Sequence, residues 1–125
     1  MKRIIRVLLV LIASSTAILY SCKHEVVVPT SPVMSYKSDI QAIFIANCTQ
    51  SGCHVSGNGH DDKVFPLSTY DEVMEHDRII PGDANNSQTY TAITTGKMPK
   101  APYAAMPDQQ VLKLYLWIMQ GAKNN

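Results

Sequence analysis

The sequence carries little charge and no excess of one sign. Charged residues make up 17% of the 125 residues, and the formal net charge is only +1. A nucleic-acid-binding domain needs a basic face, so nucleic acid is not expected as a partner. The 46% of apolar residues is typical of a globular chain and not of a disordered one. Internal repeats and low-complexity segments are also absent from the sequence.

The sequence also lacks an apolar run long enough to span a bilayer. The strongest run covers residues 7–13 and is interrupted by polar residues at 14–16, whereas a transmembrane helix needs about 20 apolar residues. Three basic residues precede this run, a combination typical of an export signal over residues 1–21. Without that signal the 10 acidic side chains outnumber the basic ones, and the net charge becomes −2.

The end of this segment resembles the lipobox of bacterial lipoproteins. Leu-Tyr-Ser-Cys at 19–22 has an aliphatic residue three positions before Cys22 and a small residue directly before it. The resemblance implies cleavage before Cys22, acylation of its sulfur and amine, and a lipid anchor in the cell envelope, facing the periplasm or the cell surface. Several acyl chains anchor a protein stably where one does not. Residues 22–34 contain two prolines and are expected to form an extended tether, with a short strand at 26–28 as the alternative.

Cysteine is scarce, and two of the three cysteines lie close together. Cys48 and Cys53 are separated by four residues, and His54 follows directly. In an oxidising compartment two such thiols can form a small disulfide loop. A zinc site is less favoured, because the three residues need a fourth ligand and no second cysteine pair exists. The third interpretation is covalent haem attachment, whose usual signature is Cys-x-x-Cys-His.

Haem attachment depends on the order of these residues more than on their spacing. Two cysteine sulfurs bond to the vinyl groups along one haem edge, while the histidine that follows is placed under the iron. Only the adjacency of Cys53 and His54 is fixed by this requirement. The two additional residues between the cysteines can be absorbed by a looser turn, since Gly52 can adopt a positive φ.

Short motifs elsewhere in the chain decide between these interpretations through a family resemblance. They are Ile-Phe-Ile-Ala-Asn-Cys at 43–48, Ser-Gly-Cys-His at 51–54, Ile-Pro-Gly-Asp at 80–83 with Ser87 and Tyr90, Gly-Lys-Met-Pro at 96–99, and Trp-Ile with Gln-Gly-Ala within 117–122. Over residues 35–125 the chain resembles the monohaem cytochrome c domain of bacterial envelope lipoproteins, in which a four-residue spacer occurs. The resemblance implies an all-α, class I cytochrome c-like fold. In that fold the first and last helices cross, and a methionine-bearing loop closes the haem crevice.

Carried over by position, the resemblance also implies a ligand set. Haem c would be attached covalently at Cys48 and Cys53. His54 would be the proximal iron ligand and Met98 the distal one. Met106 is the alternative distal ligand, because it also precedes a proline. Met98 is favoured since it follows the Gly-Lys element, and core packing is the other interpretation of Met106.

A histidine and a methionine on the iron favour electron transfer over catalysis. Methionine is a soft donor that raises the reduction potential and fills the position where oxygen or substrate would bind. The sequence offers no general base, nucleophile or phosphate loop placed for bond-making chemistry. We therefore expect a non-enzymatic electron carrier, tethered to the membrane, that exchanges electrons with other redox proteins of the envelope. The alternatives are a haem peroxidase or sensor with an open distal site, and a haem-free lipoprotein stapled by a Cys48–Cys53 disulfide.

The spacing of apolar residues predicts the first and last helices of this domain. The first begins after a capping serine, Ser35 or Ser38, and continues to about Asn47. Its expected apolar face consists of Ile40, Ile43, Phe44 and Ile45. The last helix starts at Pro107 and ends at a Gly121 cap. Its apolar positions are Val111, Leu112, Leu114, Tyr115, Leu116, Trp117 and Ile118, so we expect burial on more than one side.

Two shorter helices are predicted between them from their capping residues. Ser68 and Asp71 resemble a capping box for a helix over about 69–76. Asn86 or Ser87 can cap a second helix over about 88–94, which ends at Gly96.

Overall fold

The computed structural model describes residues 27, 30, 32–55 and 65–125. Within these ranges the chain forms helices joined by loops and contains no strand, which confirms the all-α prediction. None of the described helices has the length and apolar character of a membrane span. The export signal, Cys22 and most of the tether lie outside the described residues, so these predictions stay untested.

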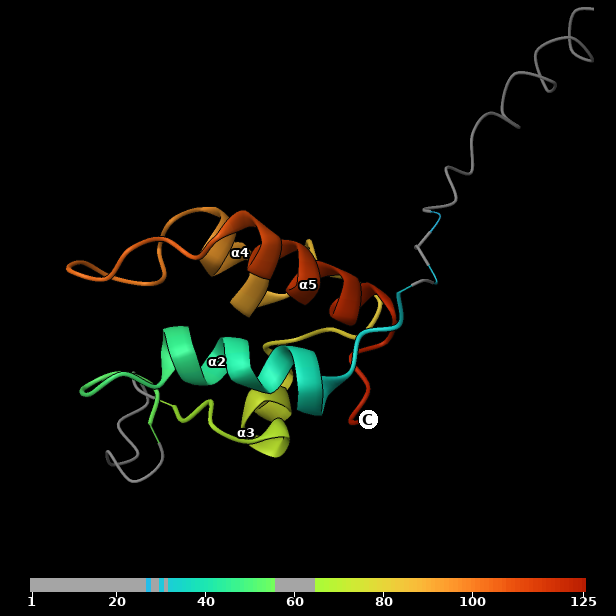
Figure 1. Ribbon diagram of the computed structural model, residues 1–125, viewed down its shortest axis with the longest axis horizontal. Coiled ribbons are helices and arrows are strands. Elements are labelled where there is room, and N and C mark those ends of the chain that lie inside the picture. The colour runs from blue at the N-terminus through green and yellow to red at the C-terminus, as the bar shows by residue number, and fades with distance from the viewer. Residues whose placement is uncertain (1–26, 28–29, 31, 56–64) are drawn as a thin grey trace, which may run out of the picture.

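Two long helical segments lie side by side and set the layout of the domain. The helical segments are, in chain order, the π-helical turn η2 (Tyr36–Ile40), α2 (Gln41–Cys48), α3 (Tyr70–Met74), the 3-10 turn η3 (Glu75–Asp77), α4 (Gln88–Thr94) and α5 (Asp108–Met119). In Figure 1, η2 and α2 run across the molecule and α5 runs back beside them. Lys113 Nζ lies 3.2 Å from Asp39 Oδ1 across this pair. Asn47 also donates to Gln110 at 3.0 Å, so α5 is tied to both ends of the first helical segment.

The hydrophobic core fills the space between these helices. Phe44 and Trp117 each expose 1% of their surface, and Leu114 and Ile118 expose none. Burial of such side chains is the main favourable term in folding. The rest of the buried cluster consists of Met34, Tyr36, Ile40, Ile43, Leu67, Val73, Ile79, Ala84, Met106 and Ala122.

Two residues expected in the core are exposed. Ile45 exposes 49% and Leu112 exposes 56% of its surface. The prediction was wrong because each helical residue is rotated by about 100° from the one before it. Ile45 therefore lies about 200° from the buried Ile43, and Leu112 lies about 200° from the buried Leu114.

The capping box of α3 uses different residues from those predicted. Thr69 Oγ1 accepts the N–H of Glu72 at 3.3 Å, and the Glu72 carboxylate accepts the N–H of Thr69 at 2.9 Å. The same carboxylate accepts the N–H of Ser68 at 2.8 Å. The Ser68–Asp71 pairing was wrong because the box favours a Glu or Gln at its third helical position, whose longer side chain reaches back to the cap.

The predicted ends of α4 and the glycine cap of α5 are confirmed, whereas α5 begins at Asp108, with Pro107 as its N-cap residue and not in its first turn. The helix α4 spans Gln88–Thr94, and Ser87 is its N-cap residue, although the buried Ser87 hydroxyl donates instead to the carbonyl of Asp83 at 2.7 Å. At the end of α5, Gly121 has a φ of 98°. Its N–H donates to Ile118 O at 3.0 Å, and the next N–H donates to Trp117 O at 2.9 Å. These two bonds form the Schellman motif expected at a glycine cap.

Tyr36 provides a test of the core through its buried hydroxyl. That hydroxyl has no hydrogen-bond partner among the described residues, and an unsatisfied buried group costs about 1–3 kcal/mol. Tyr36→Phe should therefore raise the free energy of unfolding by about 1 kcal/mol. Equilibrium denaturation near neutral pH measures this change, and a less stable variant would contradict the assignment.

The same residue makes a prediction about alkaline stability. Burial, with a smaller contribution from Glu72, raises the pKa of Tyr36 from 10.0 to about 12. Between these values the unfolded chain releases the proton and the folded chain keeps it, so stability falls as the pH rises through this window. The Tyr36→Phe variant should not lose this part of its stability. Equilibrium denaturation of both proteins at about pH 11 measures the difference.

Candidate functional site

The segment from Cys48 to His54 forms a closed loop at the end of α2. Cys48 is the last residue of the helix, and its carbonyl accepts the N–H of His54 at 2.9 Å. Inside the loop the N–H of Cys53 donates to Gln50 O at 2.8 Å, and Gly52 has a φ of 78°. The expected use of Gly52 for a positive φ is thus confirmed. The loop brings both thiols and the imidazole to one crevice.

Cys48 and Cys53 are free thiols in the structure. Burial, with a smaller contribution from the nearby Cys53, raises the pKa of the Cys48 thiol to about 11, so it is protonated at neutral pH. In the part of the chain that the structure describes, no group of three or more Cys, His, Asp or Glu side chains is placed to hold a metal ion. Among the described residues the two thiols are thus not joined, and they do not gather with His54 into a metal-holding group.

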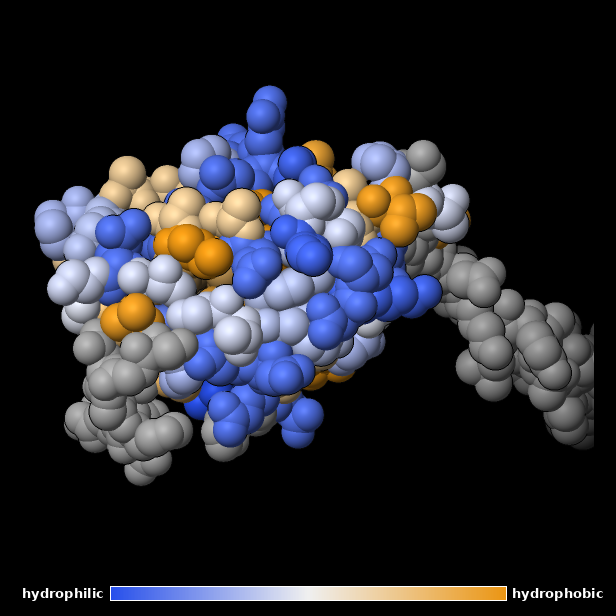
Figure 2. Space-filling view, turned by 60° about the horizontal axis from the view of Figure 1, so that its bottom comes forward, coloured by the Kyte–Doolittle hydropathy of each residue, from blue (hydrophilic) through white to orange (hydrophobic). Residues whose placement is uncertain are grey.

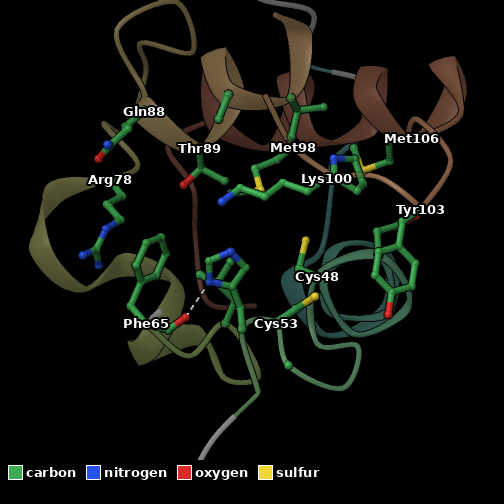
Figure 3. A pocket seen from close by; sticks show the side chains of 17 residues that line it. Cys48, Cys53, Phe65, Arg78, Gln88, Thr89, Met98, Lys100, Tyr103 and Met106 are labelled. Atoms are coloured by element: carbon green, nitrogen blue, oxygen red, sulfur yellow. Dashed lines mark hydrogen bonds between the residues drawn. The ribbon is translucent and has the colours of Figure 1, made fainter. Parts of the chain in front are cut away.

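His54 is oriented by its contacts with Phe65. Its Nδ1 lies 2.7 Å from the carbonyl oxygen of Phe65, a contact drawn as the dashed line in Figure 3. Because a carbonyl only accepts, Nδ1 carries the proton and Nε2 keeps its lone pair. The two rings also pack together, with their centroids 4.6 Å apart. Histidines that bind metals are commonly held in this way through the other ring nitrogen.

Met98 reaches the same crevice from the opposite wall. After α4, Gly96 turns the chain with a φ of 71°, and the N–H of Met98 donates to Ala92 O at 2.9 Å. In Figure 3 the Met98 side chain descends from the upper wall, while Cys48 and Cys53 point into the crevice from below. The methionine-bearing segment and the cysteine loop, far apart in sequence, therefore face each other.

Met106 borders the crevice as well but is more deeply buried. It exposes 6% of its surface and belongs to the hydrophobic core, whereas Met98 is half-buried. This burial agrees with the core-packing interpretation of Met106. Both methionines line the crevice, so the choice of Met98 as distal ligand stays a prediction.

The crevice is open to solvent and mainly apolar. Its cavity volume is about 240 Å³, just below the 300–1,000 Å³ that is common for ligand pockets. Leu67, Ile93 and Ala92 contribute apolar wall between the cysteine loop and α4. Apolar walls with a few polar groups are typical of cofactor sites.

The sequence did not point to several residues of the crevice, above all Phe65 and Arg78. The Arg78 guanidinium carbon lies 3.4 Å from the centroid of the Phe65 ring, which is a cation–π contact. No carboxylate among the described residues forms an ion pair with Arg78. The ion pair that the described residues form joins Lys113 and Asp39. In Figure 3, Arg78 and Gln88 lie at the end of the crevice away from the cysteines. A lone arginine outside any motif carries no sequence signal for such a position.

Comparisons with known proteins give no relative of this chain. No protein-family model matches it, and no curated protein or solved structure matches it either. The function must therefore be argued from the residues of the crevice and from the sequence motifs.

Proposed function

We propose that this chain is a c-type cytochrome, a lipid-anchored electron carrier of the bacterial envelope with a class I cytochrome c-like domain. The observation that carries the proposal is the convergence of two distant segments on one crevice. Cys48, Cys53 and His54 come from the loop after α2, and Met98 comes from the segment after α4. Their order along the chain and their meeting in space are both required of a covalent haem site.

The residues of the crevice fit a haem held by two thioether bonds. Two free thiols lie together at one end, and both belong to the wall of the crevice. An imidazole with an available Nε2 follows them, and a thioether faces them from the other wall. At the far end, Arg78 offers a cation that has no described carboxylate partner, which suits the acidic edge of a haem.

The side chains of this chain would then determine the chemistry of the site. A bound haem would supply an iron that accepts and releases one electron. His54 and Met98 would both hold the iron and leave no open site for a substrate, so electron transfer without bond-making is the expected activity. The thioether sulfur of Met98 would favour the reduced state of the iron and raise its reduction potential. The hydrogen bond from His54 to Phe65 fixes the imidazole and increases its basicity as a ligand.

Haem staining after denaturing electrophoresis tests this proposal directly. The full chain, produced in a bacterium that attaches haem c, should stain, because thioether-bound haem survives denaturation. Absence of staining in a folded protein would favour the haem-free lipoprotein.

The distal ligand is tested by a pair of matched substitutions. Met98→Leu removes a soft donor, so the reduction potential should fall and carbon monoxide should gain access to the iron. Met106→Leu should leave both properties nearly unchanged, because a Met-to-Leu exchange in an apolar setting costs less than about 1.5 kcal/mol. The charge-transfer band between iron and methionine, near the red end of the oxidised spectrum, reports the bond.

Each outcome of this comparison has a distinct meaning. Loss of the band in Met98→Leu alone supports Met98 as the ligand. Loss in Met106→Leu alone would assign the ligand to Met106. Absence of the band from the native protein would favour an open or nitrogen-ligated iron, as in a peroxidase or a sensor.

The membrane anchor is tested at Cys22. Cys22→Ser should release the protein from membranes or leave its precursor unprocessed, because the acyl chains are the stable anchor that the sequence predicts. Membrane fractionation and the mass of the product measure both effects. A processed variant that stays on the membrane would point instead to tight association with another envelope protein.

A further inference from the structure

The segment that leads into the domain is fastened to the last turn of α5 and to the residues after it. The side chain of Gln120 holds this segment at two points. Its Oε1 accepts the N–H of Met34 at 2.8 Å, and its Nε2 donates to the carbonyl of Pro32 at 2.9 Å. A bond on each side of Val33 fixes the direction of the segment as well as its position.

Asn125 extends this attachment toward η2. Its carbonyl accepts the Ser35 hydroxyl at 2.7 Å and the N–H of Lys37 at 3.1 Å. Its side-chain oxygen accepts the N–H of Tyr36 at 3.1 Å. We call these contacts of Gln120 and Asn125 with residues 32–37 the clasp. The clasp holds the chain at Pro32 beside the C-terminal residues of the domain.

The clasp and the crevice lie at opposite ends of the molecule. The helix α2 ends at Cys48 in the crevice, and α5 runs from the crevice side to Gln120. Figure 1 shows the loops after α2 and before α5 at one end and the C-terminal residues at the other. The 12 residues of α5 alone separate the two ends by about 18 Å.

We propose that the clasp turns the mouth of the crevice away from the lipid surface. The electron-transfer partner is then a protein domain in the aqueous phase and not a redox carrier dissolved in the bilayer. This inference rests on the proposed function and on the acylation of Cys22.

The length of the tether supports this orientation. Pro32 lies ten positions after Cys22, and a chain of this length spans about 16–19 Å when flexible and at most about 36 Å when fully extended. A domain of this size is about 30 Å across. To bring the mouth to the lipid, the tether would have to stretch beyond its flexible span toward the width of about 30 Å of the domain, which its entropy opposes.

One face of the domain offers no strong reason for the domain to lie on lipid instead. A protein that lies on a membrane presents a broad apolar face ringed by basic residues. Figure 2 shows a face that is mostly hydrophilic, with its hydrophobic side chains in small separate groups. This face therefore gives the domain no competing contact with lipid, and the attachment through the tether sets its orientation.

The orientation can be measured with spin labels on the acylated protein in phosphatidylcholine vesicles. One label is placed by Ala101→Cys in the exposed loop at the mouth, and the other by Asn124→Cys beside the clasp. A lipid that carries a nickel chelate at its headgroup should relax the label at 124 several-fold more strongly than the label at 101. Equal relaxation, stronger relaxation at 101, or failure of the protein to bind vesicles would overturn the proposal.

The role of the clasp is tested by loosening it. Gln120→Ala combined with Asn125→Ala should reduce the difference between the two labels, whereas Gln109→Ala, an exposed glutamine at the other end of α5, should not. An unchanged difference in the clasp variant would overturn the role of the clasp. Mass spectrometry of the labelled protein counts the thiols that reacted. If haem is not attached, Cys48 and Cys53 also react with the label and the count rises. This failure is thereby distinguished from failure of the orientation.

Discussion

Replacing both Cys48 and Cys53 by alanine should abolish haem staining on denaturing gels. Each sulfur would hold one vinyl-derived carbon, so the double variant has no covalent bond to the cofactor. Each single variant should keep one bond and give a lower yield of stained protein. The measurement is stain intensity relative to the amount of protein on the same gel.

Cys22→Ser is the matched control for this experiment. It also removes a cysteine but leaves both crevice thiols in place, so the stain per molecule should be unchanged. Unchanged staining of the double variant would contradict the haem assignment. If Cys22→Ser protein that is folded and exported also loses its stain, loss of the stain is not specific to Cys48 and Cys53.

His54→Ala is expected to be the most damaging single substitution in the crevice. It removes the proximal ligand, and the Phe65 carbonyl loses the donor that now lies 2.7 Å away. The protein that still carries haem should lose the six-coordinate spectrum, and the yield of holoprotein should fall severalfold. Absorption spectra of the reduced and oxidised variant measure the coordination.

A histidine from the predicted tether provides the comparison for this variant. His24→Ala changes the histidine content without touching the crevice loop, so its spectrum should match that of the native protein. A normal six-coordinate spectrum in His54→Ala would show that another residue binds the iron.

Local rules account for the parts of the fold that the sequence predicted well. The α4 boundaries and the Gly121 cap depend on residues within a few positions of each other, and both are confirmed. The closure of the cysteine loop is also local, since a positive φ at Gly52 was expected from its residue type. These features could be predicted because each depends on short stretches of sequence.

The errors and omissions come from packing between distant segments. The outward positions of Ile45 and Leu112 are set by which side of each helix meets the core, and apolarity alone does not give this. The contact of Arg78 with Phe65 joins a loop to the wall of the crevice, and no spacing rule connects the two. The clasp of Gln120 on Pro32 and Met34 spans most of the domain in sequence. Such contacts appear only once the helices have been placed.

The absorption spectrum of the purified full chain, reduced and oxidised, tests the central claim most directly. We expect the spectrum of a six-coordinate c-type haem. Reduction should give sharp visible bands, and oxidation should give the iron–methionine charge-transfer band near the red end. Folded, exported protein without haem absorption would contradict the account.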